Sequence, residues 1–164
     1  MSEKILKVYK IKIFTNKIIK LAMYEEKLAY IGFENDNIHD FYKGYKVRNV
    51  LNETGFEKYI EMLRKFENHE EIKINFDDFY LNNLTEKQIE ILQEVAKLKY
   101  GQYFTYSDFA KLINKVDHTR FIATCMAKNP ILLLIPCHRL VSKNLEIKYR
   151  SGKEIKNFLI SNKY

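Results

Sequence analysis

Residues 136–139 read Pro-Cys-His-Arg and directly follow a run of five apolar residues, 131–135. The apolar run predicts a buried segment, which places Cys137 at the edge of the protein interior. Pro136 fixes its own φ angle and lacks a backbone donor, so the thiol is held in one place. Positive charge from His138 and Arg139 would lower the pKa of the thiol, and the thiolate is the nucleophilic form of cysteine. The pattern therefore predicts that Cys137 is a reactive nucleophile.

His138 is the nearest base for this thiol, but neighbouring side chains of an extended segment point to opposite faces. A direct hydrogen bond between Cys137 and His138 would therefore need a turn, and a bridging water is the easier relay. The competing interpretation is a buried, inert thiol, which is the usual state of a lone cysteine. The cysteines and histidines lack paired zinc-type spacing, so we expect no metal site.

The composition is that of a globular protein, with 164 residues, 46% hydrophobic and 30% charged. Two cysteines are too few for a disulfide framework and favour a reducing compartment, hence the cytoplasm. Residues 1–10 are charged throughout, unlike a signal peptide. No apolar run approaches the length of a membrane span, so we expect no membrane association.

The charge of the chain is placed unevenly. Residues 1–83 hold 14 Lys and Arg and 14 Asp and Glu, whereas residues 84–164 hold 14 and 7. The whole net charge of +7 thus lies in the half that contains Cys137. A one-sided basic excess is typical of proteins that bind polyanions, although surface lysines also serve solubility alone.

The first half of the chain is predicted to be mainly strands. Residues 4–14 alternate charged and apolar side chains, and residues 18–23 and 28–33 are short runs rich in Ile, Tyr and Phe. These three segments predict a small antiparallel meander. Apolar residues at helical spacing follow over 56–66, and residues 72–76 are interpreted as one more strand.

The second half is predicted to be helical and follows a polar linker at 77–83. Thr85 and Gln88 have the spacing of a capping box, which predicts a helix that starts there and is ended by Gly101. A final amphipathic helix is expected at 153–162.

Two short helices are expected between these. Thr105 or Ser107 can cap the first, and Asp117 can cap the second, which spans about 118–128. The turn between them, residues 114–117, gives helix-turn-helix spacing. We therefore predict an α/β fold in two parts. Residues 1–80 form a small antiparallel-sheet-plus-helix domain, and residues 84–164 form a helical, winged-helix-like domain with the cysteine.

The segment Pro136-Cys137-His138-Arg139 resembles the alkyl-acceptor motif of the O6-alkylguanine-DNA alkyltransferases, also called methylated-DNA–protein-cysteine methyltransferases. Further anchors keep the spacing of that family: Gly101 to Tyr106, Arg120, Met126, Asn129-Pro130, Tyr149 with Gly152, and Lys156 with Leu159. The resemblance covers about residues 85–160, while the N-terminal part matches only in size and strand content.

The resemblance implies the chemistry. Cys137 attacks the alkyl carbon on O6 of a damaged guanine and keeps the alkyl group, so each molecule acts once. Because the protein is itself the acceptor, no cofactor is needed. His138 acts through water as the base, and Tyr149 protonates the purine as it leaves. The function implied is direct-reversal DNA repair by a single-turnover methyltransferase.

The resemblance also implies a partner, double-stranded DNA with an alkylated guanine. The target atom is inaccessible in a duplex, so the nucleotide must be flipped out. Tyr106 would crowd the phosphate, and Arg120 would enter the stack in place of the base. Asn129 would tie the recognition helix to the active-site turn, and Arg139 is grouped with the DNA-binding residues. The family places this helix in the minor groove, whose readout is degenerate. We expect a monomer.

Three positions depart from the family pattern. Lys163 stands where a glutamate usually holds the histidine, and a lysine there would lower the histidine's pKa, so we expect slower transfer unless Glu154 or Glu146 substitutes. Phe121 is larger than the small residues usual on the recognition helix. Lys148 replaces a glycine that often precedes the tyrosine, which leaves alkyl-group preference open.

Two other functions are left open by the residues. The first is a non-catalytic sensor of alkylated DNA, as in relatives without a working acceptor, and Lys163 favours it mildly. The second is an unrelated thiol enzyme such as a hydrolase, which would need a base remote in sequence.

Overall fold

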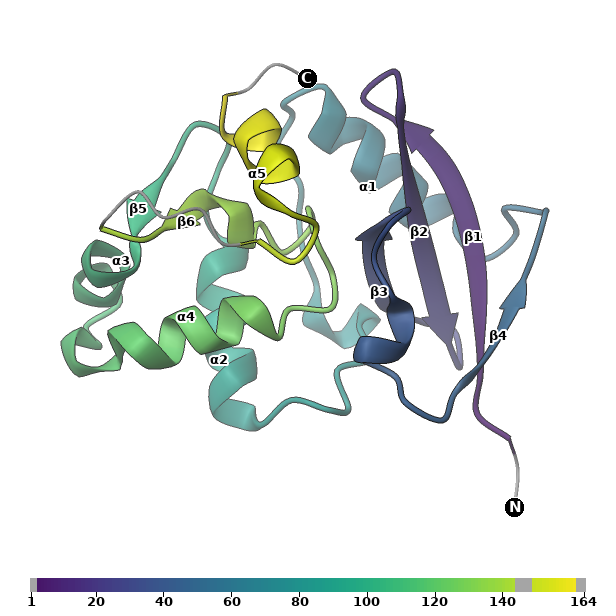
Figure 1. Ribbon diagram of the computed structural model, residues 1–164, viewed down its shortest axis with the longest axis horizontal. Helices are drawn as coiled ribbons and strands as arrows, with labels where there is room; N and C mark the ends of the chain where they lie inside the picture. Colours follow the sequence, from purple (N-terminus) through teal and green to yellow (C-terminus); the bar gives the residue numbers. More distant parts are fainter. Residues whose placement is uncertain (1–2, 144–148, 162–164) are drawn as a thin grey trace. The chain divides into compact units, whose positions relative to one another are not determined.

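The computed structural model of the protein describes residues 3–143 and 149–161 (Figure 1). The chain divides into two compact units. The first unit holds the chain up to Asn83 together with Pro130–Leu134, and the second holds Leu84–Asn129 together with the chain from Ile135 onward. No sequence feature predicts that Pro130–Leu134 groups with the first unit.

The first unit is built on a four-stranded sheet whose order is β3-β2-β1-β4. Strands β1 (Ile5–Ile13), β2 (Lys17–Tyr24) and β3 (Lys27–Phe33) pair antiparallel, which confirms the predicted meander (Figure 1). Strand β4 (Lys46–Asn49) pairs parallel with β1 and was not predicted. The β3 edge pairs with the returning segment, because the Ile31 amide donates to the Pro130 carbonyl at 3.0 Å.

Strand β1 buries apolar side chains on both of its faces: Leu6 and Val8 on one, Ile11 and Ile13 on the other. Helix α1 (Glu57–Glu67) confirms the helix predicted over 56–66, and it packs against the second face. There the ring of Phe56, which begins the helix, lies 5.6 Å from the ring of Tyr9. The first face packs against a cluster that includes Tyr30, Tyr42 and Tyr45.

The predicted strand at 72–76 is wrong. Residues 71–75 lie outside the strands of the sheet and lead into a short 3₁₀ helix, η2 (Phe76–Asp78). The side chain of Asn75 accepts a hydrogen bond from the Asp77 amide and so starts this turn. The described part of this unit also contains a 3₁₀ helix η1 (Ile38–Asp40).

The second unit begins with α2 (Glu86–Ala96), whose capping box is as predicted. The Gln88 amide donates to the Thr85 hydroxyl at 3.2 Å, and the Thr85 amide donates to the Gln88 side chain at 2.9 Å. The helix ends at Ala96, before the predicted stop at Gly101, which lies in the following turn with a φ of 85°.

Helices α3 (Tyr106–Leu112) and α4 (Thr119–Ala127) form the predicted helix-turn-helix pair. The 3₁₀ helix η3 (Val116–His118) lies between them. Asp117 therefore lies inside η3, and His118 occupies the cap position of α4 without a side-chain cap bond, so the predicted cap was wrong.

The remaining elements surround the cysteine. Strand β5 (Phe104–Thr105) pairs parallel with β6 (Leu140–Val141). The 3₁₀ helix η4 (Cys137–Arg139) immediately precedes β6, and α5 (Lys153–Ile160) closes the described chain. A sheet-and-helix unit followed by a helical unit is the α/β fold class that was predicted. No helix in the described ranges has both the length and the apolar character to cross a membrane.

Candidate active site

Two tight turns lead to the cysteine. All residues from Ile131 to Ile135 are buried, as the apolar run predicts. Leu133 has a φ of 71°, and the Leu134 amide donates to the Leu132 carbonyl at 2.8 Å, which is a γ-turn with positive φ. Such a turn at a residue with a side chain is strained and persists only where the surroundings impose it.

The second turn is centred on Pro136, with φ of −80° and ψ of 64°. The Cys137 amide donates to the Ile135 carbonyl at 2.8 Å across this inverse γ-turn. Cys137 then starts η4, so the chain bends at the Cys137–His138 step and is not extended as the sequence argument assumed.

The thiol of Cys137 lies in the interior, with an exposed fraction of 4%. Asn129, at the end of α4, donates its amide to the Ile135 carbonyl at 2.9 Å and hydrogen-bonds the thiol. Burial raises the pKa of the Cys137 thiol, whereas the Asn129 hydrogen bond and the charges of Arg150 and Lys156 lower it. Burial is the largest effect, so the pKa is raised overall and the resting thiol is neutral.

This electrostatic pattern corrects the sequence argument, which attributed activation to His138 and Arg139. The positive charges that favour the thiolate belong to Arg150 and Lys156 instead. Both residues lie beyond β6 in the chain, so adjacency to the cysteine could not reveal them. The one signal in the sequence was the family spacing of Lys156.

Lys156 is buried in α5, with 1% of its surface exposed. Its Nζ donates to the Leu140 carbonyl at 2.8 Å, directly after η4. Burial lowers the pKa of Lys156, and the Cys137 charge acts in the opposite direction. Arg150 is partly buried and donates to the Asn129 carbonyl at 2.7 Å. The two basic residues therefore hold backbone carbonyls on either side of the cysteine turn.

His138 is fully buried, and its ring meets the ring of Tyr149 edge to face at 6.5 Å. Burial, followed by the charges of Arg139 and Lys156, keeps the pKa of His138 well below its usual value. The imidazole is therefore neutral and retains a lone pair that can accept a proton. Of the three predicted catalytic residues, His138 is the one that connects the other two. Its ring lies beside the ring of Tyr149, and it follows Cys137 directly in η4.

Arg139 does not occupy the surface position that its grouping with DNA-binding residues requires. It is 7% exposed, and its Nη1 donates to the Leu98 carbonyl, just after α2, at 2.6 Å. A buried guanidinium must be satisfied by such bonds, because breaking them would leave a buried charge uncompensated. This position fits a residue that fixes η4 against the end of α2.

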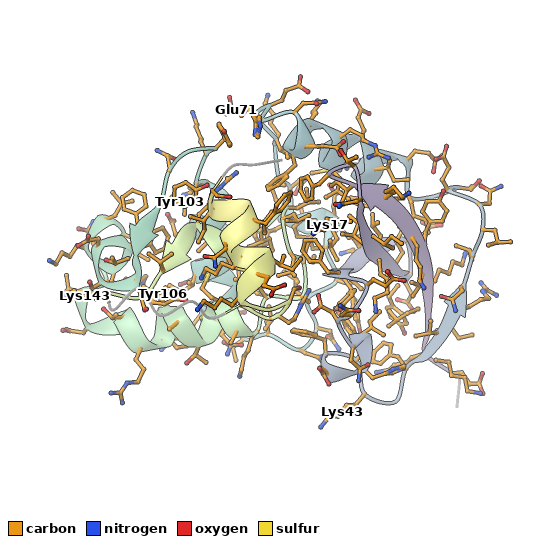
Figure 2. The ribbon with its side chains drawn as sticks, turned by 45° about the horizontal axis from the view of Figure 1, so that its top comes forward. Lys17, Lys43, Glu71, Tyr103, Tyr106 and Lys143 are labelled. Atoms are coloured by element: carbon orange, nitrogen blue, oxygen red, sulfur yellow. The ribbon has the colours of Figure 1, made fainter. Side chains whose placement is uncertain are left out.

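The other predicted DNA-binding residues differ in exposure. Tyr106 is half-buried and is the first residue of α3 (Figure 2). Thr105 caps this helix, since its hydroxyl accepts a hydrogen bond from the Asp108 amide at 3.1 Å. Burial, and then the Cys137 charge, raises the pKa of Tyr106. Arg120 is exposed in the first turn of α4. Asn129 is 1% exposed, so it ties α4 to the cysteine turn from the inside.

The structure describes only some of the residues at which the sequence departs from the family pattern. Phe121 is partly buried, and the centre of its ring lies 6.2 Å from that of His118, so its side chain is not fully exposed on α4. Glu154 is exposed on α5. Glu146, Lys148 and Lys163 lie outside the described residues.

A family model for the DNA-binding domain of 6-O-methylguanine DNA methyltransferase matches residues 86–162 of this chain. Residues 86–162 are therefore similar to the DNA-binding domain of this family.

Curated relatives carry the name methylated-DNA–protein-cysteine methyltransferase. The Metallosphaera sedula protein is 35% identical over 104 residues, which cover 62% of this chain and 65% of that protein. The Methanocaldococcus vulcanius protein is 38% identical over 81 residues, 49% of each. The inducible protein of Bacillus subtilis is 36% identical over 77 residues, 46% of this chain and 43% of that one. The chain thus spans less than two thirds of the length of these relatives.

Solved structures share the fold. The O6-methylguanine methyltransferase of Mycobacterium tuberculosis has a TM-score of 0.74 at 17% identity and covers 95% of this chain and 91% of its own. The O6-methylguanine-DNA methyltransferase of Pyrococcus kodakaraensis has a TM-score of 0.72 at 19% identity, covering 95% and 97%. At these identities the likeness concerns the fold alone.

Proposed function

We propose that the protein repairs DNA directly, by moving an alkyl group from O6 of guanine to Sγ of Cys137, once per molecule. The observation that carries the proposal is the position of this thiol. It is held at the turn after α4 by Asn129, in a domain that matches the DNA-binding domain of the methyltransferase family. The methyltransferase names of the relatives support the same reaction.

The reaction balances without a further reagent. The bond between the alkyl carbon and O6 breaks, and the bond between that carbon and Sγ forms. The thiol proton passes through water to the neutral ring of His138, while Tyr149 donates a proton to the departing guanine. Asn129, Arg150 and Lys156 stabilise the thiolate as it forms, because each of them lowers the pKa of Cys137 against the effect of burial.

We infer that the partner is double-stranded DNA with the alkylated nucleotide flipped out of the stack. The exposed side chain of Arg120 on α4 can enter the space that the base leaves, and Tyr106 at the start of α3 can meet the phosphate. The match of residues 86–162 to a DNA-binding domain supports this partner. Asn129 and Arg139 hold the turn rather than touch DNA.

We further propose that the protein acts as a monomer in the cytoplasm. One chain carries both the thiol and the helix-turn-helix pair. Its two cysteines are free thiols, which is the usual state in a reducing compartment.

Intact-mass spectrometry tests the proposal. The full chain is mixed with a duplex oligonucleotide that carries one O6-methylguanine, and we expect the protein to gain the mass of one methylene group on the peptide that holds Cys137. Cys125 provides a matched control, since it is also buried and burial raises its pKa to about 11. Cys125→Ser should retain transfer and Cys137→Ser should lose it.

Two outcomes would contradict the proposal. Tight binding of the methylated duplex without a mass change would identify a sensor of alkylated DNA. Turnover of a generic ester or peptide that Cys137→Ser abolishes would identify a thiol hydrolase.

A further inference from the structure

A groove of about 530 Å³ lies in the second unit, between the end of α2 and the helix α3. Its apolar lining consists of Leu98, Phe104, Phe109, Leu112 and Ile113. Within the described part of the chain, no residue of α4 lines it. The proposed alkyl transfer therefore makes no use of this groove, and an occupant there would leave the recognition helix uncovered.

Exposed apolar side chains gather around the groove. Among the described residues, five large apolar side chains are exposed, and three of them lie in this region: Tyr100 at 42%, Leu112 at 58% and Val116 at 60%. Leu112 lines the groove itself, and Tyr100 and Val116 belong to the two segments that border it. Apolar side chains that cluster at a hollow are typical of surfaces that bind a partner.

The rim of the groove is basic. Lys97 and Lys115 line it, and its single acidic lining residue, Glu94, is in an ion pair with Lys97 at 3.0 Å. Lys99 and Lys111 are exposed in the same two segments, together with Asp108 and Asp117, so the lining and these segments carry four positive and three negative side chains. A partner that fits this rim carries negative charge.

We propose that this groove docks an acidic peptide segment of a partner protein, with large apolar side chains in the hollow and carboxylates against the lysines. The volume is within the range of small-ligand sites, about 300–1,000 Å³, and accommodates more than one such side chain. Leu98, Leu112 and Ile113 are aliphatic and Phe109 is 1% exposed, so the hollow offers little aromatic face on which a base could stack, and this favours a peptide over a nucleic acid strand. The docking site would bring the protein to other proteins independently of the reaction at Cys137.

Fluorescence anisotropy on the full chain tests the docking site. The probe is a fluorescein-labelled dodecapeptide with two phenylalanines among aspartates. We expect saturable binding that weakens about tenfold in Leu112→Asp, since a carboxylate would then lie in the apolar floor. Leu51→Asp is the matched control, because Leu51 is 99% exposed and lies in the first unit, and it should bind like the unchanged protein.

A second pair of variants tests the rim. Lys115→Glu should weaken binding, whereas Lys43→Glu, an exposed lysine of the first unit, should not. A peptide with serine in place of both phenylalanines should bind at least tenfold more weakly. Circular dichroism confirms that each variant is folded, and Leu112→Asp should still accept a methyl group from DNA.

Any of three results would overturn the docking site. The first is no binding of the acidic peptide, or equal binding of the serine peptide. The second is unchanged affinity in Leu112→Asp. The third is a concentration-dependent dimer, seen by sedimentation and abolished by Leu112→Asp, which would make a second copy of the chain the occupant.

Discussion

Two opposing effects act on the pKa of the Cys137 thiol. Burial favours the neutral thiol, while the Asn129 amide and the charges of Arg150 and Lys156 favour the thiolate. The first influence is the larger, so the side chain rests in its less nucleophilic form. The alkyl transfer proposed above would use each molecule once, and this arrangement would protect the sulfur before that reaction, because stray alkylating agents and oxidants meet a protonated thiol.

The pH dependence of Cys137 reactivity follows from this balance. Because the pKa of the folded-state thiol is raised, the thiolate fraction is small at neutral pH and grows as the pH rises. In a Cys125→Ser background, we expect the rate of reaction with iodoacetamide to increase continuously from pH 7 to about pH 9. Lys156→Met removes a charge that lowers this pKa and should slow the reaction about three- to tenfold at pH 8.

Lys153→Met is the matched control for this measurement, since Lys153 is exposed on the same helix. Its rate should equal that of the background protein. A rate that levels off below pH 8, or an effect of Lys153→Met as large as that of Lys156→Met, would contradict the assigned role of Lys156. Mass spectrometry of the alkylated peptide gives the rates.

At the residue scale, the sequence predicted a nucleophile but did not predict the side chains that surround it. Cys137 was found from its neighbours, because an apolar run, a proline and two basic residues are contiguous in the chain. The burial of Arg139 against the Leu98 carbonyl depends on a residue 41 positions away, which no local pattern encodes. For the same reason Arg150 was not recognised as a source of charge beside the thiol.

Helix α5 carries Lys156 to the cysteine turn, and Gly152 begins this helix with a φ of 103°. A residue with a Cβ is strained at this angle. Gly152→Ala should therefore destabilise the protein by about 1–2 kcal/mol and should also slow the iodoacetamide reaction of Cys137, since α5 would shift. Urea unfolding and the alkylation rate measure the two effects.

Gly44→Ala separates the effect of backbone strain on stability from the effect of the position of α5 on Cys137. Gly44 has a φ of 81° in the first unit, and a Cβ at either glycine meets no atom within 4 Å. The two substitutions should therefore cost similar stability, but Gly44→Ala should leave the reactivity of Cys137 unchanged. Equal loss of reactivity in both variants would show that α5 has no special role.

Elements with a strong local signal were predictable, and those that depend on distant pairing were not. The capping box of α2 and the alternation in β1 depend only on residues that are close together in the chain. Strand β4 reads Lys-Val-Arg-Asn, without apolar alternation, and exists because β1 offers a parallel partner far away in the chain. Residues 72–76 show the reverse case, since they alternate well but end at the turn that Asn75 starts.

Charge is a property of the whole molecule, and its excess lies in residues 84–164. If this excess meets DNA phosphates, affinity for an undamaged duplex should fall steeply as salt is added, because bound counterions are released. Arg120→Ala should reduce the slope of log K against log salt by about one. Arg48→Ala, an exposed arginine of the first unit, should leave the slope unchanged.

Fluorescence anisotropy at several salt concentrations measures these slopes. An equal change in both variants would mean that the first unit takes the same part in DNA binding. No dependence on salt would remove the electrostatic basis for a DNA partner altogether.

The short segment Pro130–Leu134 determines how the two fragments would behave after the chain is cleaved between the units. The Leu132 amide donates to the Ile31 carbonyl at 3.2 Å, within the first unit, although residues on both sides of the segment belong to the second. A protease cut near Asn83 would therefore yield two pieces that stay together, because one piece supplies a strand-like edge to the other. The same arrangement means that a fragment starting at Leu84 would expose four apolar side chains to water and would aggregate unless the missing piece were added back.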